Sequence, residues 1–84
     1  MSTNIYVGNL AFSTDSDALR DLFAAYGEVT KAQVVTDRDT GRSRGFGFVE
    51  MAVADEANKA IGEMNGKSIE GRQMNVNIAK ERSR

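Results

Sequence analysis

The sequence predicts an α+β fold with the element order βαββαβ, in which two helices cover one face of a four-stranded antiparallel sheet. Four short runs, at residues 5–8, 29–36, 44–51 and 73–79, are predicted to be half-buried strands, in which successive side chains point to opposite faces of the sheet. Two segments between these runs repeat apolar residues at helical spacing. One shared core accounts for both helical stripes and one face of every strand, so the other face of the sheet is expected to be uncovered.

The first strand is expected at residues 5–8, and a helix follows it after a short loop. Thr14 is the predicted N-cap of this helix, because its hydroxyl can accept a hydrogen bond from the first turn. Gly27 is predicted to end the helix in the left-handed conformation that glycine tolerates best. The apolar stripe of the helix consists of Leu19, Leu22, Phe23 and Tyr26.

Two further strands are expected at residues 29–36 and 44–51, joined by a polar hairpin loop. The second helix is expected at residues 55–65 and the last strand at residues 73–79, where apolar and polar residues alternate. The residues of the last strand that are expected to face the core are Met74, Val76 and Ile78.

The composition excludes most enzyme classes. The 84 residues include no cysteine and no histidine, so disulfides, thiolate metal sites and the commonest general base are absent. We therefore expect no enzymatic activity, no metal and no cofactor. No apolar run approaches the roughly 20 residues that span a bilayer, and the N-terminus does not resemble a secretory signal. A soluble, cytoplasmic monomer with no membrane partner is the resulting expectation.

The net charge of −1 contrasts with the basic excess that is typical of proteins that bind nucleic acid. The charges are, however, unevenly distributed along the chain. Basic residues exceed acidic ones in the segments 31–50 and 72–84, whereas acidic residues exceed basic ones in the segments that contain the helices. Because the local field governs the attraction of a polyanion, the sheet face is expected to be positive or neutral and the helical face negative.

Strand parity places three of the six aromatic residues, Tyr6, Phe46 and Phe48, on the uncovered face of the sheet. A soluble protein rarely exposes such a patch without using it. Inverted parity would bury these rings, but it would expose four apolar residues on the same strands. A tail helix or a partner protein that covers the patch is the other alternative. The remaining aromatic residues, which are expected to pack with the core, are Phe12, Phe23 and Tyr26.

The third expected strand resembles the signature of a known family. Residues 44–51, RGFGFVEM, are similar at seven of eight positions to the octapeptide K/R-G-F/Y-G/A-F-V-x-F/Y of the RNA recognition motif (RRM). The exception is Met51, which is expected to face the core, so the change concerns packing more than binding. Residues 5–10, IYVGNL, are similar to the companion hexapeptide of the family, and residues 65–72 also fit it.

The resemblance covers residues 4 to about 80, and it is to the small single-RRM proteins of bacteria and plastids. It implies a ferredoxin-like sandwich formed by one domain at residues 1–80, followed by a short charged tail at residues 81–84. The function that it implies is non-catalytic binding of single-stranded RNA, by a post-transcriptional regulator or an RNA chaperone. Single-stranded DNA is an alternative ligand.

The resemblance also implies roles for the residues of the two motifs. Tyr6 and Phe48 would each stack one base, and Phe46 would pack against the sugars between them. Arg44 would contact a phosphate. The glycines of the octapeptide, which would allow close packing of the helices on the sheet, are Gly45 and Gly47.

Polar residues on the neighbouring strands flank the aromatic residues on the same face. Asn75 and Asn77 are the first candidates for sequence specificity because amides can hydrogen-bond base edges, although a solvated face also explains their polarity. The flanking candidates on the second strand are Lys31, Gln33 and Val35. The candidates for phosphate contact in the hairpin loop and the tail, where the alternative is a solvated charge, are Arg38, Arg42, Lys80 and Arg82.

Two other functions are compatible with this order of elements. An RRM can instead dock a partner protein through its sheet or helix face, but the three intact aromatic residues argue against that. Small acylphosphatases share a similar architecture, but they need a phosphate-cradling loop after the first strand, and residues 8–12 contain no basic residue. Residues 41–47 are glycine-rich, but they lack the Gly-Lys-Ser/Thr ending of a phosphate loop and lead into a strand.

Overall fold

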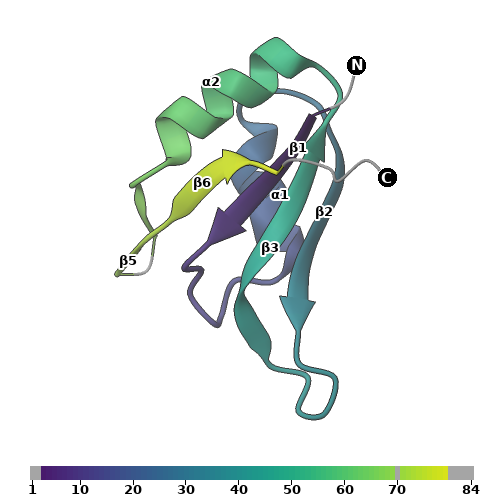
Figure 1. The fold of residues 1–84 in the computed structure, drawn as a ribbon, viewed down its shortest axis with the longest axis vertical. Coiled ribbons are helices and arrows are strands. Elements are labelled where there is room, and N and C mark those ends of the chain that lie inside the picture. Colours follow the sequence, from purple (N-terminus) through teal and green to yellow (C-terminus); the bar gives the residue numbers. More distant parts are fainter. Residues whose placement is uncertain (1–2, 70, 80–84) are drawn as a thin grey trace.

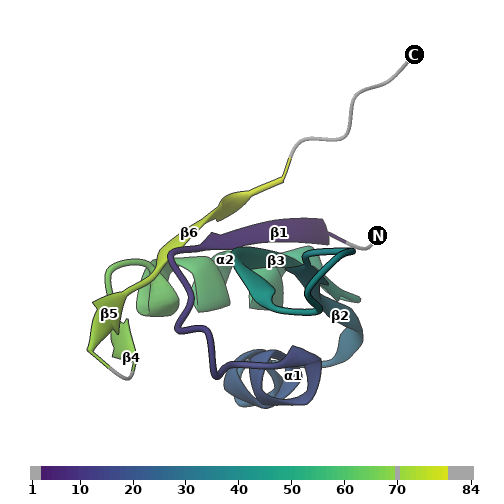
Figure 2. The same ribbon diagram turned by 90° about the horizontal axis from the view of Figure 1, so that it is seen from below.

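The computed structural model describes residues 3–69 and 71–79 of the chain. It confirms the expected order of elements, with two helices packed on one face of a four-stranded antiparallel sheet (Figure 1, Figure 2). A small two-stranded hairpin, which the sequence pattern did not predict, precedes the last strand. The elements are β1 (Thr3–Gly8), α1 (Ser16–Ala24), β2 (Val29–Thr36), β3 (Ser43–Met51), α2 (Ala54–Met64), β4 (Ser68–Ile69), β5 (Arg72–Gln73) and β6 (Asn75–Ile78).

The strand order β2-β3-β1-β6 places the two strands that carry the motifs, β1 and β3, at the centre of the sheet (Figure 1). Tyr6 on β1 lies directly opposite Phe48 on β3 and opposite Asn77 on β6. Phe48 also lies opposite Gln33 on β2. Residues that lie directly opposite each other share a face of the sheet, so these four side chains form one row across all four strands.

Burial confirms the parity that was predicted for the central strands. Ile5 and Val7 of β1 and Val49 and Met51 of β3 are all buried under the helices, so the alternative of inverted parity is wrong. Figure 2 shows both helices on the same side of the sheet. The residues that the helices and β6 add to this core are Leu19, Phe23, Ala57, Ala60, Met64 and Val76.

The two glycines of the octapeptide have different roles. At Gly47, an added Cβ would lie 2.5 Å from the carbonyl oxygen of Gln33 and 3.1 Å from Cδ2 of Leu19, so this glycine permits close packing, as predicted. At Gly45, an added Cβ would approach nothing nearer than 3.6 Å, but the backbone has φ +86°. The packing role predicted for Gly45 is therefore wrong, because this position needs glycine for its left-handed conformation.

The ends of α1 differ from the prediction. The N-cap is Asp15 rather than Thr14: the Asp15 carboxylate accepts a 2.9 Å hydrogen bond from a backbone N–H of the first turn, and Thr14 is buried. Gly27 does not adopt a left-handed conformation, and the C-cap Ala25 keeps right-handed helical angles. A side chain at Gly27 would instead collide with Glu56, so Gly27 provides clearance. Neither helix in the described ranges has the length and hydropathy that a membrane span requires.

Two residues that were expected in the core are exposed instead. Phe12 keeps 69% of its surface accessible, because it lies in the loop between β1 and α1 and packs beside Gly45 at the end of the sheet. Ile78 keeps 50% accessible, because it is the last residue of β6, which is an edge strand of the sheet. Of the two, Phe12 bears directly on the candidate site.

Candidate nucleic-acid interface

Tyr6, Phe46 and Phe48 form a cluster on the face of the sheet opposite the helices, which we call the aromatic triad. The ring centroid of Tyr6 lies 6.0 Å from that of Phe46 and 5.8 Å from that of Phe48, and the centroids of the two phenylalanine rings are 6.1 Å apart. Phe48 is exposed and the other two rings are half-buried against one another. Tilted and edge-to-face pairs of this kind are each worth about 0.5–1.5 kcal/mol, so the triad is held in place before any ligand binds.

Gly8 positions Tyr6 within the triad, a role that was not predicted from the sequence. An added Cβ at Gly8 would lie 2.6 Å from the Tyr6 hydroxyl oxygen and 2.9 Å from Cε2 of the ring. Gly8 also lies opposite Phe46 on β3. The Tyr6 ring therefore lies down over its own strand, in the space that the missing side chain leaves, and this brings it next to Phe46.

Three of the flanking polar residues lie where the sequence predicted them. Gln33 and Asn77 are exposed at the two ends of the row that Phe48 and Tyr6 form, and Asn75 is exposed opposite Gly8. Their amide groups can donate and accept hydrogen bonds at both edges of the triad. The structure therefore gathers amides, rather than charges, immediately around the aromatic rings.

The other two candidates on β2 are less well placed for a ligand on the triad. Lys31 is exposed, but it lies opposite Glu50 on β3, so an acidic residue shares its part of the sheet face. Val35 is half-buried and falls at an irregularity in the pairing of β2 with β3, between Val34 and Thr36. The strand register therefore does not bring Val35 into the row across the sheet.

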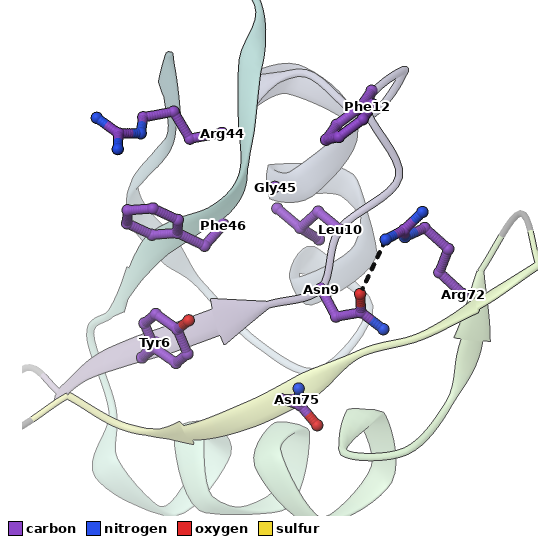
Figure 3. A pocket seen from close by; sticks show the side chains of 9 residues that line it. All are labelled: Tyr6, Asn9, Leu10, Phe12, Arg44, Gly45, Phe46, Arg72 and Asn75. Carbon is purple, nitrogen blue, oxygen red and sulfur yellow. Dashed lines mark hydrogen bonds between the residues drawn. The ribbon is translucent and has the colours of Figure 1, made fainter. Parts of the chain in front are cut away.

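The arginines near the octapeptide are all exposed. Arg44 on β3 borders the triad beside Phe46 (Figure 3), whereas Arg38 and Arg42 lie in the loop between β2 and β3. That loop is closed by a 2.7 Å hydrogen bond from the backbone N–H of Asp37 to the carbonyl oxygen of Arg42. The two basic residues that were predicted in the tail, Lys80 and Arg82, lie outside the described residues.

Three residues that were not predicted from the sequence border the same surface. The Arg72 guanidinium lies 5.6 Å from the centroid of the Phe12 ring, and Arg72 Nη2 donates a 3.2 Å hydrogen bond to Asn9 Oδ1. Asn9 Nδ2 in turn donates a 2.7 Å hydrogen bond to the carbonyl oxygen of Gln73. Phe12, Asn9 and Arg72 border a cavity of about 360 Å³. Figure 3 shows the triad rings Tyr6 and Phe46 across from Phe12 and Arg72. The signal that could have drawn attention to Phe12 was an aromatic residue in the loop after the first strand, directly before the polar residues Ser13 and Thr14.

The fold and the triad define a class of protein: RRM domains, in which aromatic side chains on the two central strands form the binding face. The family model for the RNA recognition motif matches residues 5–75. The chain therefore belongs to the RNA recognition motif family.

The chain is similar to organellar proteins of plants. It is 54% identical over 83 residues to the glycine-rich RNA-binding protein 4, mitochondrial, of Arabidopsis thaliana, covering 99% of this chain and 61% of that protein. It is 49% identical over 83 residues to the 28 kDa ribonucleoprotein, chloroplastic, of Spinacia oleracea, covering 99% of this chain and 36% of that protein. The chain thus spans less than two thirds of the length of each of these relatives.

Solved structures agree with this assignment. The crystal structure of the RNA-binding protein PG1 matches with a TM-score of 0.91 and 49% sequence identity, over 98% of this chain and 99% of that one. The second RRM domain of the yeast poly(U)-binding protein Pub1 matches with a TM-score of 0.85 and 33% identity, over 98% and 99%. The family and these relatives support a non-catalytic role in RNA binding and do not favour the alternative of a protein-docking RRM.

The expectation of a cytoplasmic location is wrong. The similar plant proteins are named as mitochondrial or chloroplastic, which points to organelles. Composition could not have predicted this, because targeting segments, rather than the residues of a folded domain, specify the compartment.

Proposed function

We propose that this domain, at residues 1–80, binds single-stranded RNA without catalysis by stacking bases on the aromatic triad. The observation that carries the proposal is the triad itself. Three aromatic rings meet within about 6 Å of one another on a sheet face that no other element of the described ranges covers. A packing role does not account for them, because the core on the opposite face is already filled by the residues of inward parity.

Each part of the interface has a separate task in this proposal. Tyr6 and Phe48 each stack one base, at about 1–3 kcal/mol per base, and Phe46 packs against the sugars between them. The amides of Asn75, Asn77 and Gln33 contact base edges and supply what sequence preference there is. Lys31 and Val35, which lie outside the row across the sheet, contact the RNA at the periphery of the interface. The residues assigned to phosphates are Arg38, Arg42, Arg44, Lys80 and Arg82.

Single-stranded RNA is the ligand because paired bases cannot lie flat on the sheet. Single-stranded DNA is a second ligand, since stacking on an aromatic ring does not require a 2′-hydroxyl group. One copy of the domain suffices, because every residue named above comes from the same chain. The chemistry of the surface is that of binding alone, since a chain without histidine or cysteine offers no common nucleophile–base pair.

NMR titration of the ¹⁵N-labelled domain with a randomised pool of short RNAs tests the proposal. We expect amide shifts to concentrate on β1 and β3 and on the flanking residues of β2 and β6. A hairpin duplex of the same composition should produce much smaller shifts. Shifts confined to α1 and α2, or equal affinity for duplex and single strand, would contradict stacking on the triad. Selection from the same pool separates the two biological roles, because a regulator enriches a sequence whereas a chaperone does not.

A further inference from the structure

The loop between β2 and β3, at residues 37–42, carries two acidic residues beside the two arginines that are assigned to phosphates. These acidic residues are Asp37 and Asp39, and each negative charge opposes the approach of RNA. We propose that Asp37 is a positioning residue, whose carboxylate folds the loop before RNA arrives and so fixes the backbone that carries Arg38 and Arg42. The inference deepens the proposed function and rests on it, because it concerns how the same interface holds its cations.

Asp37 lies at the centre of the hydrogen bonds of this loop. Its Oδ1 atom accepts hydrogen bonds from the backbone N–H groups of Asp39, at 2.8 Å, and of Thr40, at 3.4 Å. Its carbonyl oxygen accepts a hydrogen bond from the N–H of Gly41, at 2.7 Å. Its own N–H donates the 2.7 Å hydrogen bond to the carbonyl oxygen of Arg42. Asp37 is therefore bonded to every residue from 39 to 42.

This network fixes the backbone of Arg42 on both sides. The carbonyl oxygen of Arg42 is held by Asp37, and its N–H donates a 3.3 Å hydrogen bond to Thr40 Oγ1. Figure 1 shows the loop extending past the sheet, so contacts within the loop maintain its conformation. Ordering a free loop on binding costs conformational entropy, and a loop that is already ordered avoids most of that cost. Arg38 and Arg42, which are both exposed, thus extend from a backbone that is fixed in advance.

Asp39 is a matched comparison within the same loop. It is exposed, whereas Asp37 is half-buried. Within residues 37–42, the carboxylate of Asp39 accepts no hydrogen bond, and this residue contributes only its backbone N–H to the network. The two carboxylates carry the same charge but differ in what they hold. Their substitution therefore separates the effect of charge from the effect of position.

Four variants that each remove one negative charge test the inference: Asp37→Ala, Asp37→Asn, Asp39→Ala and Asp39→Asn. Fluorescence anisotropy with a labelled, randomised pool of single-stranded RNA measures their affinity at several salt concentrations. If charge alone mattered, all four would bind roughly twofold more tightly, which is the effect of one unit charge at about 8 Å in water. We expect this result for both Asp39 variants and for Asp37→Asn, because an asparagine keeps an acceptor oxygen at the position of Oδ1.

Asp37→Ala should change the affinity in the opposite direction. The N–H groups of Asp39 and Thr40 lose their acceptor, so the loop is released and up to two phosphate contacts weaken. The slope of log K against log salt should become shallower by up to about 1.4, at about 0.7 for each contact. At about 0.1 M salt, a slope of 0.7 corresponds to about fivefold in affinity relative to 1 M. Binding by Asp37→Ala should therefore weaken several-fold, although a repulsive charge has been removed.

NMR reads the conformation of the loop independently of RNA. The ¹H–¹⁵N heteronuclear NOE of the Asp39 and Thr40 amides should fall in Asp37→Ala and stay at the wild-type value in Asp37→Asn. Circular dichroism checks that each variant is folded, which we expect because none of residues 37–42 belongs to the core. A wild-type NOE in Asp37→Ala would refute the positioning role even without any binding data.

The remaining outcomes also distinguish this inference from the proposed function. Tighter binding by Asp37→Ala with an unchanged salt slope would show that Asp37 acts only as a charge, and the proposed function would stand if Phe48→Ala binds weakly. Equal weakening by Asp37→Ala and Asp37→Asn would show that the charge, rather than the acceptor oxygen, is needed, and would overturn the inference. If Phe48→Ala binds the pool normally, the proposed function itself is wrong, and the inference fails with it.

Discussion

Phe48 and Val49 are adjacent in β3 but point to opposite faces of the sheet, so alanine substitutions at the two positions separate binding from folding. Phe48 is 42% exposed and Val49 is 1% exposed. Phe48→Ala removes two aromatic contacts, to Tyr6 and Phe46, at a partly solvated site where each is worth about 0.5 kcal/mol, the lower end of the usual range. With the loss of strand propensity, the free energy of unfolding should fall by less than about 1.5 kcal/mol.

The same substitution should affect RNA much more strongly. Loss of one stacked base weakens binding by about 1–3 kcal/mol, which is roughly 5- to 150-fold in Kd. Val49→Ala removes two methyl groups from a fully buried site and should lower the free energy of unfolding by about 1–3 kcal/mol, while the folded fraction binds RNA normally.

Urea denaturation followed by circular dichroism gives the free energy of unfolding of each variant. Fluorescence anisotropy with a labelled single-stranded RNA gives its Kd. Each variant serves as the control for the other, because they differ mainly in the direction in which the side chain points. Unfolding of the domain by Phe48→Ala, together with normal stability for Val49→Ala, would refute the assignment of the two faces. Normal RNA binding by a folded Phe48→Ala variant would refute stacking on the triad.

Three further predictions concern the glycines and the charges. Gly47→Ala would place a Cβ 2.5 Å from the backbone oxygen of Gln33, so the free energy of unfolding should fall by about 1–3 kcal/mol in urea denaturation, and an unchanged value would contradict the packing role. Gly8→Ala should displace the Tyr6 ring, weaken RNA binding several-fold in anisotropy titrations and change stability little. Unaltered affinity would show that the position of the ring is unimportant. The slope of log K against log salt should be about −1.4 to −2.8, for two to four phosphate contacts, and a slope steeper than about −5 would show a larger basic surface.

The fold and the triad could be predicted because strand alternation leaves little choice. A strand with one buried face must direct every second residue inward, so assigning Ile5 and Val7 to the core also assigned Tyr6 to the outer face. The octapeptide fixed Phe46 and Phe48 in the same way. Parity therefore predicted side-chain direction on every central strand without any knowledge of tertiary contacts.

Loops and helix ends could not be predicted in this way, because distant residues decide them. Phe12 lies in a loop without periodicity, and the guanidinium of Arg72 packs over its ring. Arg72 is held there by Asn9, from which it is separated by 63 residues in the chain. Gly27 was predicted from the preference of glycine for left-handed helix ends, but Glu56 from the other helix packs against it. The Glu56 carboxylate also accepts a 3.2 Å hydrogen bond from the backbone N–H of Glu28, which no local pattern reports.

The near-neutral charge of the chain is consistent with how the interface is built. The helices, which lie behind the sheet, carry the acidic residues Asp17, Asp21, Asp55, Glu56 and Glu63. The central part of the sheet face carries three aromatic rings and the amides beside them. The arginines lie at the edge of this face, not among the rings. Contacts between basic residues and phosphates supply most of the non-specific affinity for nucleic acid. A duplex offers phosphates but no accessible bases, so a sheet face of this composition should bind duplexes weakly. Discrimination between paired and unpaired RNA should therefore increase, rather than decrease, as salt is raised and the phosphate contacts weaken.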